Sequence, residues 1–193
     1  MNLVDRAKNI ILTPKTEWGV IDGESHTVQD LYTGYVMILA AIPPICTFIG
    51  FSLLGMGLFG TVYRVPITSG IVQLILSYVL SLGSVYVLAL IIDALAANFG
   101  GQKNFLQAFK VAAFAPTASW LAGIFSIIPV LSILGLVGLY SIYLLYTGLP
   151  RLMKAPEDKA VPYTVIVIIV AIVLAIIVGA LAGLAVPGRM RGF

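Results

Sequence analysis

A run of 39 residues, from Val111 to Leu149, contains no Asp, Glu, Lys or Arg. As a single α-helix rising about 1.5 Å per residue, it would be about 58 Å long, nearly twice the roughly 30 Å hydrocarbon core of a bilayer. The run must therefore fold back on itself. Pro129 lies near its middle, beside Ser126 and Ser132, and favours two membrane helices joined by a very short turn.

Three further apolar runs have the length of a membrane span, from Leu31 to about Leu58, from Gly70 to about Leu95 and from Pro162 to Val186. With 60% hydrophobic and only 10% charged residues, the chain lies outside the composition of soluble domains. The sequence therefore predicts an all-α polytopic membrane protein, a bundle of five transmembrane helices preceded by short amphipathic helices. The expected spans are about 31–58, 70–95, 110–128, 130–149 and 162–186.

Basic residues fall unequally on the two sides of this arrangement, and cytoplasmic loops collect Lys and Arg. With the N-terminus inside, the cytoplasmic segments contain eight of the eleven basic residues: Arg6, Lys8, Lys15, Lys103, Lys110, Arg151, Lys154 and Lys159. The other side contains Arg64, Arg189 and Arg191. We therefore expect a cytoplasmic N-terminus and a C-terminus outside.

Residues 1–30, here called the collar, mix polar and apolar side chains and precede the transmembrane domain of residues 31–193. Its first apolar residues recur at helical spacing and predict a short interfacial helix: Leu3, Val4, Ala7, Ile10 and Ile11. Pro14 can open a second helix in which Trp18 suits the headgroup level. Thr27 and Asp30 have the spacing of a capping box before the first span. Either the collar lies on the lipid surface, or it caps the cytoplasmic end of the bundle.

Four stretches resemble the Yip (Ypt-interacting protein) family in its short bacterial branch. They are ILTPKTEWGVI followed by Asp30-Leu-Tyr32, AAIPPICTFIG, FLQAFKVAAFAPTASW and LYTGLPRLMKAPEDKA. The resemblance implies five spans, a cytoplasmic N-terminus and a bacterial inner (cytoplasmic) membrane. Eukaryotic members bind prenylated small GTPases in vesicle traffic, but this chain has only about 30 residues before its first span, where those members have a long domain. The resemblance assigns no activity to particular residues.

Polar residues inside the membrane are costly and need a reason. Asp93 is the only acid within a span, where it could pair with Lys103 or Lys110 or belong to a proton or cation path. One face of the same span carries polar side chains that could line a path or serve as packing contacts: Gln73, Ser77, Ser81 and Ser84.

Prolines within spans predict helix kinks, at Pro43 and Pro44 in the first span and at Pro116 in the third. Broken helices line substrate sites in transporters, but kinks are also common without a ligand. In the fifth span, small residues recur every four positions and predict a close helix contact, either within the chain or in a homo-oligomer: Ala171, Ala175, Gly179 and Gly183.

The sequence supports no enzyme and no cofactor. It has one His and one Cys, and it lacks the HExxH and Walker motifs. Four candidate metal ligands gather within nine residues of the collar, where a hydrated turn is the competing interpretation: Asp22, Glu24, His26 and Asp30. A net charge of +3 gives no case for nucleic acid but fits attraction to anionic lipid headgroups, to which Arg6, Lys8 and Lys15 would contribute about 1 kcal/mol each.

Two functions from different classes follow. The first is a non-enzymatic membrane protein that organises the membrane or binds a protein partner through its cytoplasmic face. The alternative is a small transporter or channel for an ion or small solute, which would use the kinked first and third spans and the polar face of the second. Asp93 and the Gln73 to Ser84 face would carry the second function, and the collar the first.

Overall fold

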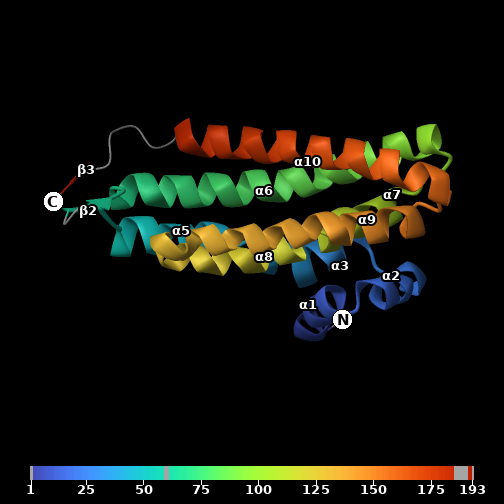
Figure 1. Ribbon diagram of the computed structural model, residues 1–193, viewed down its shortest axis with the longest axis horizontal. Helices are drawn as coiled ribbons and strands as arrows, with labels where there is room; N and C mark the ends of the chain where they lie inside the picture. The colour runs from blue at the N-terminus through green and yellow to red at the C-terminus, as the bar shows by residue number, and fades with distance from the viewer. Residues whose placement is uncertain (1, 59–60, 185–190, 193) are drawn as a thin grey trace.

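Five helical segments of the chain are long and apolar enough to cross a membrane, which confirms the predicted all-α polytopic class. The structure, a computed structural model, describes residues 2–58, 61–184 and 191–192. The five segments run side by side along the long axis of the molecule (Figure 1). Their bounds are Val28–Leu54, Ile67–Phe99, Phe105–Ile127, Pro129–Leu152 and Glu157–Leu184.

The first span is built from short pieces rather than one regular helix. It runs through α3 (Val28–Leu31), η1 (Tyr32–Val36), α4 (Met37–Leu39), α5 (Ile42–Phe48) and η2 (Ile49–Leu54), where η1 and η2 are π-helical. The α-helix is interrupted at Ala40 and Ala41, just before Pro43 and Pro44 in the first turn of α5. Proline tolerates a first helical turn but not a helix interior, because it has no amide hydrogen to donate.

The second span is a regular helix, α6 (Ile67–Ala96), which continues into η3 (Ala97–Phe99) and ends at Gly100 in the left-handed region, with φ of 71°. The third divides into α7 (Phe105–Phe114), α8 (Thr117–Ala122) and η4 (Gly123–Ile127). The break between α7 and α8 is a turn at Ala115 and Pro116.

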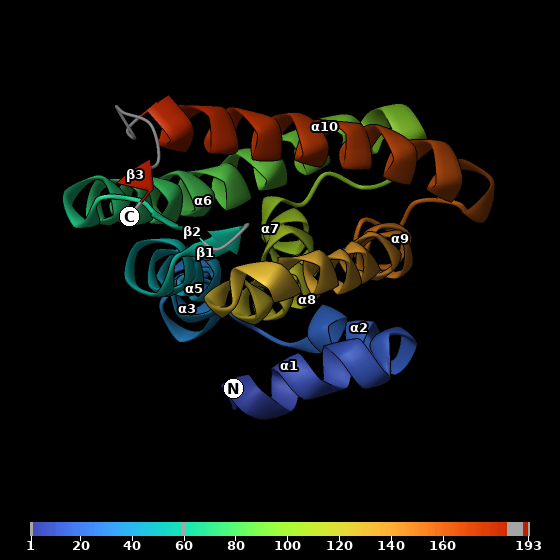
Figure 2. The ribbon, with the colours of Figure 1, turned by 60° about the vertical axis from the view of Figure 1, so that its left-hand side comes forward.

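The uncharged run folds back at Ile128, whose backbone is extended, and Pro129 then opens the next helical segment. The fourth span comprises η5 (Pro129–Leu139) and α9 (Tyr140–Leu152), and the fifth is α10 (Glu157–Leu184). In Figures 1 and 2, α10 lies along α6, and the hairpin of the third and fourth spans lies on the other side of α6.

A small antiparallel sheet lies at the end of the molecule opposite the collar, called the sheet end below. Its order is β1 (Met56–Leu58), β2 (Thr61–Arg64) and β3 (Arg191–Gly192), with Met56 opposite Tyr63 and Tyr63 opposite Gly192. This sheet was not predicted from the sequence, and the predicted first span continued to residue 58, into β1. Arg189 and the last two residues of the predicted fifth span, 185–186, lie outside the described residues.

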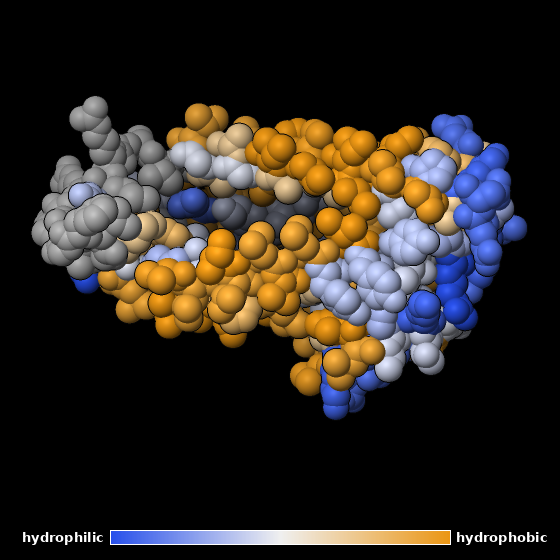
Figure 3. Space-filling view, viewed as in Figure 1, coloured by the Kyte–Doolittle hydropathy of each residue, from blue (hydrophilic) through white to orange (hydrophobic). Residues whose placement is uncertain are grey.

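The collar contains two helices, α1 (Leu3–Leu12) and α2 (Pro14–Gly23), as the sequence predicts. The Asn2 side chain accepts a hydrogen bond from the Val4 amide at 3.1 Å and caps α1. A capping box joins Thr27 and Asp30 at the start of α3. Both collar helices lie against the side of the bundle in Figures 1 and 2. Figure 3 shows hydrophilic residues gathered at this end, the collar end, and hydrophobic residues along the spans.

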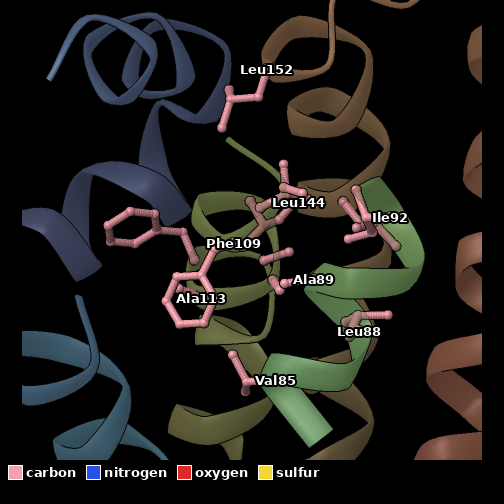
Figure 4. Close-up of a cluster of buried hydrophobic side chains, with 14 of the residues drawn as sticks. Val85, Leu88, Ala89, Ile92, Phe109, Ala113, Leu144 and Leu152 are labelled. Carbon is pink, nitrogen blue, oxygen red and sulfur yellow. The ribbon is translucent and has the colours of Figure 1, made fainter. Parts of the chain in front are cut away.

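The core lies where α6, α7 and α9 meet. Figure 4 shows buried side chains from all three helices pointing toward one another, among them Ile92 of α6, Phe109 of α7 and Leu144 of α9. All three residues are fully buried. The collar packs against these middle helices of the bundle, with α2 beside α9.

Candidate functional site

Trp18 of α2 is the largest side chain that the collar inserts into the bundle, and it is fully buried. Its ring lies edge-on to Phe114 of α7, with centroids 6.4 Å apart. It also lies against Gly148 of α9, where an added Cβ would come closer than 3.0 Å to the ring. The prediction that Trp18 lies among lipid headgroups is therefore wrong, because a glycine in α9 opens a seat for the ring within the protein.

Arg6 of α1 also faces inward, with only 6% of its surface exposed. Its guanidinium forms ion pairs with Glu17 and Glu24, and lies 5.7 Å from the centroid of the Phe114 ring. Of the three collar cations expected to meet lipid headgroups, Arg6 is therefore used inside the protein. Lys8 and Lys15 remain exposed.

Glu24, just after α2, joins this cluster. Its carboxylate pairs with Arg6 and lies 3.1 Å from Nε2 of His26. Partial burial raises the pKa of Glu24, but the hydrogen bonds and charges of Arg6 and His26 outweigh burial and hold that pKa below its ordinary value. Glu24 is thus held in its charged form at neutral pH.

The C-terminal end of α2 is fastened to α7 by side chains that enter from the third span. The ammonium of Lys110 donates hydrogen bonds to the carbonyls of Ile21 at 2.8 Å and Glu24 at 2.7 Å. Nε2 of Gln107 donates to the backbone carbonyl of Asp22 at 3.2 Å and to its Oδ1 at 3.0 Å. A cation at a helix C-terminus satisfies free carbonyls and complements the helix dipole.

This use of Lys110 corrects the ion pair predicted for Asp93. Within the described part of the chain, Asp93 has no basic group within 4.0 Å, and its buried Oδ1 has no hydrogen-bond partner. Lys110 instead donates its hydrogen bonds to backbone carbonyls of the collar. The sequence signal for this role was a lysine inside a predicted span, but nothing in its spacing indicates that carbonyls of residues 21 and 24 are its acceptors.

The four candidate metal ligands have other partners. Asp22 pairs with Lys154, Glu24 with Arg6, and Asp30 accepts from the Thr27 amide at 2.9 Å. Among residues 2–58, 61–184 and 191–192, no three His, Cys, Asp or Glu side chains come together as a metal site would require. Asp22 and Glu24 instead hold the collar in place, His26 contacts Glu24, and Asp30 caps α3.

The polar face of α6 borders two adjoining cavities. The smaller, of about 340 Å³, lies toward the sheet end and is lined by Gln73 and Ser77 together with Pro43 and Pro44 of the first span. The larger, of about 1010 Å³, lies between α6, α10 and the hairpin of the third and fourth spans. Residues common to both cavities are Ser81, Trp120, Val178 and Gly179.

Most residues of the predicted polar path thus lie together around these cavities, and Asp93 lies apart from them. Ser84 and Pro116 border the larger cavity, so the polar face and all three span prolines surround this space. Asp93 lines neither cavity, because it lies nine residues beyond Ser84 toward the collar end of α6.

The small-residue face of α10 also borders this space, through Ala171, Ala175 and Gly179. An added Cβ on Gly179 or Gly183 would meet no heavy atom of the described chain within 4 Å. At these two glycines the face therefore makes no close contact with another span of the same chain. Close approaches occur elsewhere, at Gly50 and Gly123.

Comparison with known proteins gives the chain its family. The family model of the Yip1 domain matches residues 8–179. Two relatives, both named inner membrane protein YohC, come from Escherichia coli K12 and Escherichia coli O6:H1. Each is 30% identical to this chain over 117 residues, which is 60% of this chain and 60% of the relative's length. No solved structure matches. The chain belongs to the Yip1 domain family.

Proposed function

We propose that this protein is a non-enzymatic component of a bacterial inner membrane that organises anionic lipid at the cytoplasmic face. The exposed side of α1 is the surface that does so. The family and the names of the relatives support the class of membrane protein. The lipid-binding role rests on the geometry of the collar.

The observation that carries the proposal is the division of α1 into a docked side and an exposed side. Ile10 is fully buried, and the Ile11 carbonyl accepts a hydrogen bond from the Tyr140 hydroxyl at 2.9 Å. On the other side, Val4 and Leu12 are 68% and 66% exposed, with Lys8 between them at helical spacing of four. Apolar side chains flanking a cation are typical of helices that lie in a bilayer interface.

The position of α1 supports the same function. Figure 1 shows α1 beside the bundle rather than beyond its end, and Figure 3 shows that the spans carry a band of hydrophobic residues. Ion pairs and the buried Trp18 hold it there, so little conformational entropy remains to be lost when lipid binds. A fixed helix presents Val4, Lys8 and Leu12 together at the headgroup level.

The direct test measures the depth of α1 in vesicles of phosphatidylethanolamine and phosphatidylglycerol. A fluorophore is attached at Val4→Cys in a Cys46→Ser background, and at Gln102→Cys, in an exposed loop at the same end, as the control. Headgroup-linked nitroxide lipids should quench the Val4 label, whereas aqueous iodide should quench the Gln102 label. Quenching of the Val4 label by iodide alone would contradict the proposal.

The preference for anionic lipid has its own test. Spin-labelled phosphatidylglycerol should quench the Val4 label more than spin-labelled phosphatidylcholine. The double variant Lys8→Gln and Lys15→Gln should lose this preference, because each exposed cation contributes about 1 kcal/mol of attraction to an anionic surface. Equal quenching by the two lipids in the unaltered chain would refute the anionic preference. Deleting residues 1–21 is a poorer test, because it would empty the seat of Trp18 and remove one carbonyl acceptor of Lys110.

The alternative function, transport of an ion or small solute, makes the opposite prediction. It would depend on Asp93 or on the Gln73 to Ser84 face and would not depend on Lys8 or Lys15. Solute flux across the vesicles that Asp93→Asn abolishes and the double lysine variant leaves intact would replace the proposal.

A further inference from the structure

The larger cavity is a groove that opens through the side of the bundle. Its floor is α6, including Ser84 and Leu88, and its two walls are α10 and the hairpin of the third and fourth spans. Figure 3 shows the hollow between α10 and the hairpin, with hydrophobic residues on both rims. Ile172 on one rim and Ile142 on the other are exposed. In a membrane, this opening faces lipid hydrocarbon.

Four of the six serines that line the groove offer no hydroxyl hydrogen to a ligand, because they already donate it to carbonyls of the protein; Ser126 and Ser141 are the other two. A hydroxyl has a single hydrogen to donate. The donations are Ser81 to Tyr78 at 2.7 Å, Ser84 to Ser81 at 2.7 Å, Ser119 to Gly138 at 2.9 Å and Ser132 to Pro129 at 2.6 Å. The remaining surface is mainly aliphatic and favours hydrocarbon over an ion.

The size of the groove fits a chain-like ligand. Along α10 it runs from Ile168 to Gly179, and these eleven steps of about 1.5 Å span about 16 Å. That length is close to half of the roughly 30 Å hydrocarbon core, which is the depth of one leaflet. Its volume of about 1010 Å³ lies at the upper end of the roughly 300–1,000 Å³ typical of sites for small molecules.

The smaller cavity adds a polar end to this apolar groove. It continues from Ser81 and Gly179 toward the sheet end, where Gln73 and Ser77 line it. Within the part of the chain that the structure describes, neither of these two side chains makes a hydrogen bond to the protein. The Gln73 amide therefore has two N–H donors available for a ligand. An aliphatic groove that ends at an amide donor matches an acyl chain that ends at an ester carbonyl.

We propose that this groove binds one bilayer phospholipid, with an acyl chain between α6, α10 and the hairpin and an ester carbonyl at Gln73. Trp120 is only 8% exposed but lines both cavities. It would contact the acyl chain where the two cavities meet. The site is separate from the exposed side of α1. It binds lipid from the leaflet at the sheet end, whereas α1 contacts the other leaflet.

Native mass spectrometry of the detergent-purified chain tests the proposal, after exchange from vesicles of phosphatidylethanolamine and phosphatidylglycerol. Gly179→Phe fills the groove, and its Cβ would meet no heavy atom of the described residues within 4 Å, so the fold should be retained. Ala180→Phe, on the next and exposed residue outside both cavities, is the matched control. The unaltered chain and Ala180→Phe should carry one retained phospholipid, which Gly179→Phe loses. Gln73→Leu should reduce retention without changing thermal stability.

A second measurement keeps the test independent of detergent. Phospholipid brominated along its acyl chains should quench Trp120 fluorescence, obtained as the difference between the unaltered chain and Trp120→Phe. Gly179→Phe should suppress this quenching and Ala180→Phe should not. Two results would overturn the proposal. The first is an unaltered chain that retains no lipid. The second is a dimer that Gly179→Phe dissociates, which would show that a second copy of the chain occupies the groove.

Discussion

Arg6 contacts three different groups at once, the carboxylates of Glu17 and Glu24 and the face of Phe114. Glu17 and Glu24 lie 11 and 18 residues from Arg6, and Phe114 lies 108 residues from it. All three meet Arg6 only because α1 and α2 fold back on each other beside α7. An amphipathic pattern shows which residues share a helix face. It does not show whether that face meets lipid or protein, so the sequence assigned Arg6 to the wrong environment.

Replacing Arg6 by Met should destabilise the protein. Met preserves much of the side-chain volume but leaves Glu17 as a buried charge without its partner, which costs about 3–5 kcal/mol. The free energy of unfolding, measured by denaturant titration in detergent, should fall by that order. Lys8→Met, on the exposed side of α1, should change it by about 0.5 kcal/mol or less.

The double variant Arg6→Met and Glu17→Gln separates loss of the pair from loss of volume, because it removes both charges together. It should recover part of the lost stability. If Arg6→Met alone unfolds like the unaltered chain, the ion pairs do not hold the collar.

Acidification should loosen the collar. The folded-state pKa of Glu24 is below its ordinary value of 4.5, so near that pH the folded chain binds fewer protons than the unfolded chain. The stabilisation is complete above about pH 4.5 and is lost as pH falls through the lowered folded-state pKa. Proteolysis of the collar in vesicles should accelerate below pH 4.5, and less steeply in Glu24→Gln. An identical pH profile in that variant would exclude Glu24 as the group responsible.

The first span shows how far sequence reasoning reaches at the level of an element. Proline chemistry predicts an interruption near Pro43, since neither Pro43 nor Pro44 can donate a backbone hydrogen bond. The π-helical segments η1 and η2 on either side leave no comparable signal, because they depend on packing against other spans. The sheet was missed for a related reason: Arg64 and Arg191 are neighbouring only in the folded chain.

A close contact between the first span and η4 gives a prediction for this element. An added Cβ on Gly50 would lie closer than 3.0 Å to the backbone oxygen of Ser126, and a backbone oxygen cannot rotate away. Gly50→Ala should therefore lower the free energy of unfolding by about 1–3 kcal/mol. Gly34→Ala, in the same span with open space around it, should be neutral or stabilise by up to about 1 kcal/mol. Equal effects of the two substitutions would show that the span does not depend on this contact.

At the scale of the whole molecule, five spans place the collar and the sheet at opposite ends (Figure 1). The number of spans could be predicted because a hydrocarbon core limits helix length, and the fold-back of the uncharged run follows from length alone. The groove could not be predicted in this way. Periodicity identifies Gln73 to Ser84 as one face, but which other spans border that face depends on long-range packing.

The orientation expected from the basic residues is tested by labelling single cysteines with an impermeant maleimide in a Cys46→Ser background. Exposed positions at the collar end are Ser25, Gln102 and Glu157, and Thr68 is exposed near the sheet end. Thr68→Cys should react in intact cells, and the other three only after the membrane is opened. Reaction of Ser25→Cys in intact cells would reverse the orientation.

The site that buries the Trp18 ring is completed late in the synthesis of the chain. Gly148, which receives the ring, is translated 130 residues after Trp18, or roughly 7 to 26 seconds later at about 5–20 residues per second. During that interval the ring and Arg6 lack the binding surface that later buries them. The first helices to leave the ribosome therefore cannot reach their native positions until the third and fourth spans have been made.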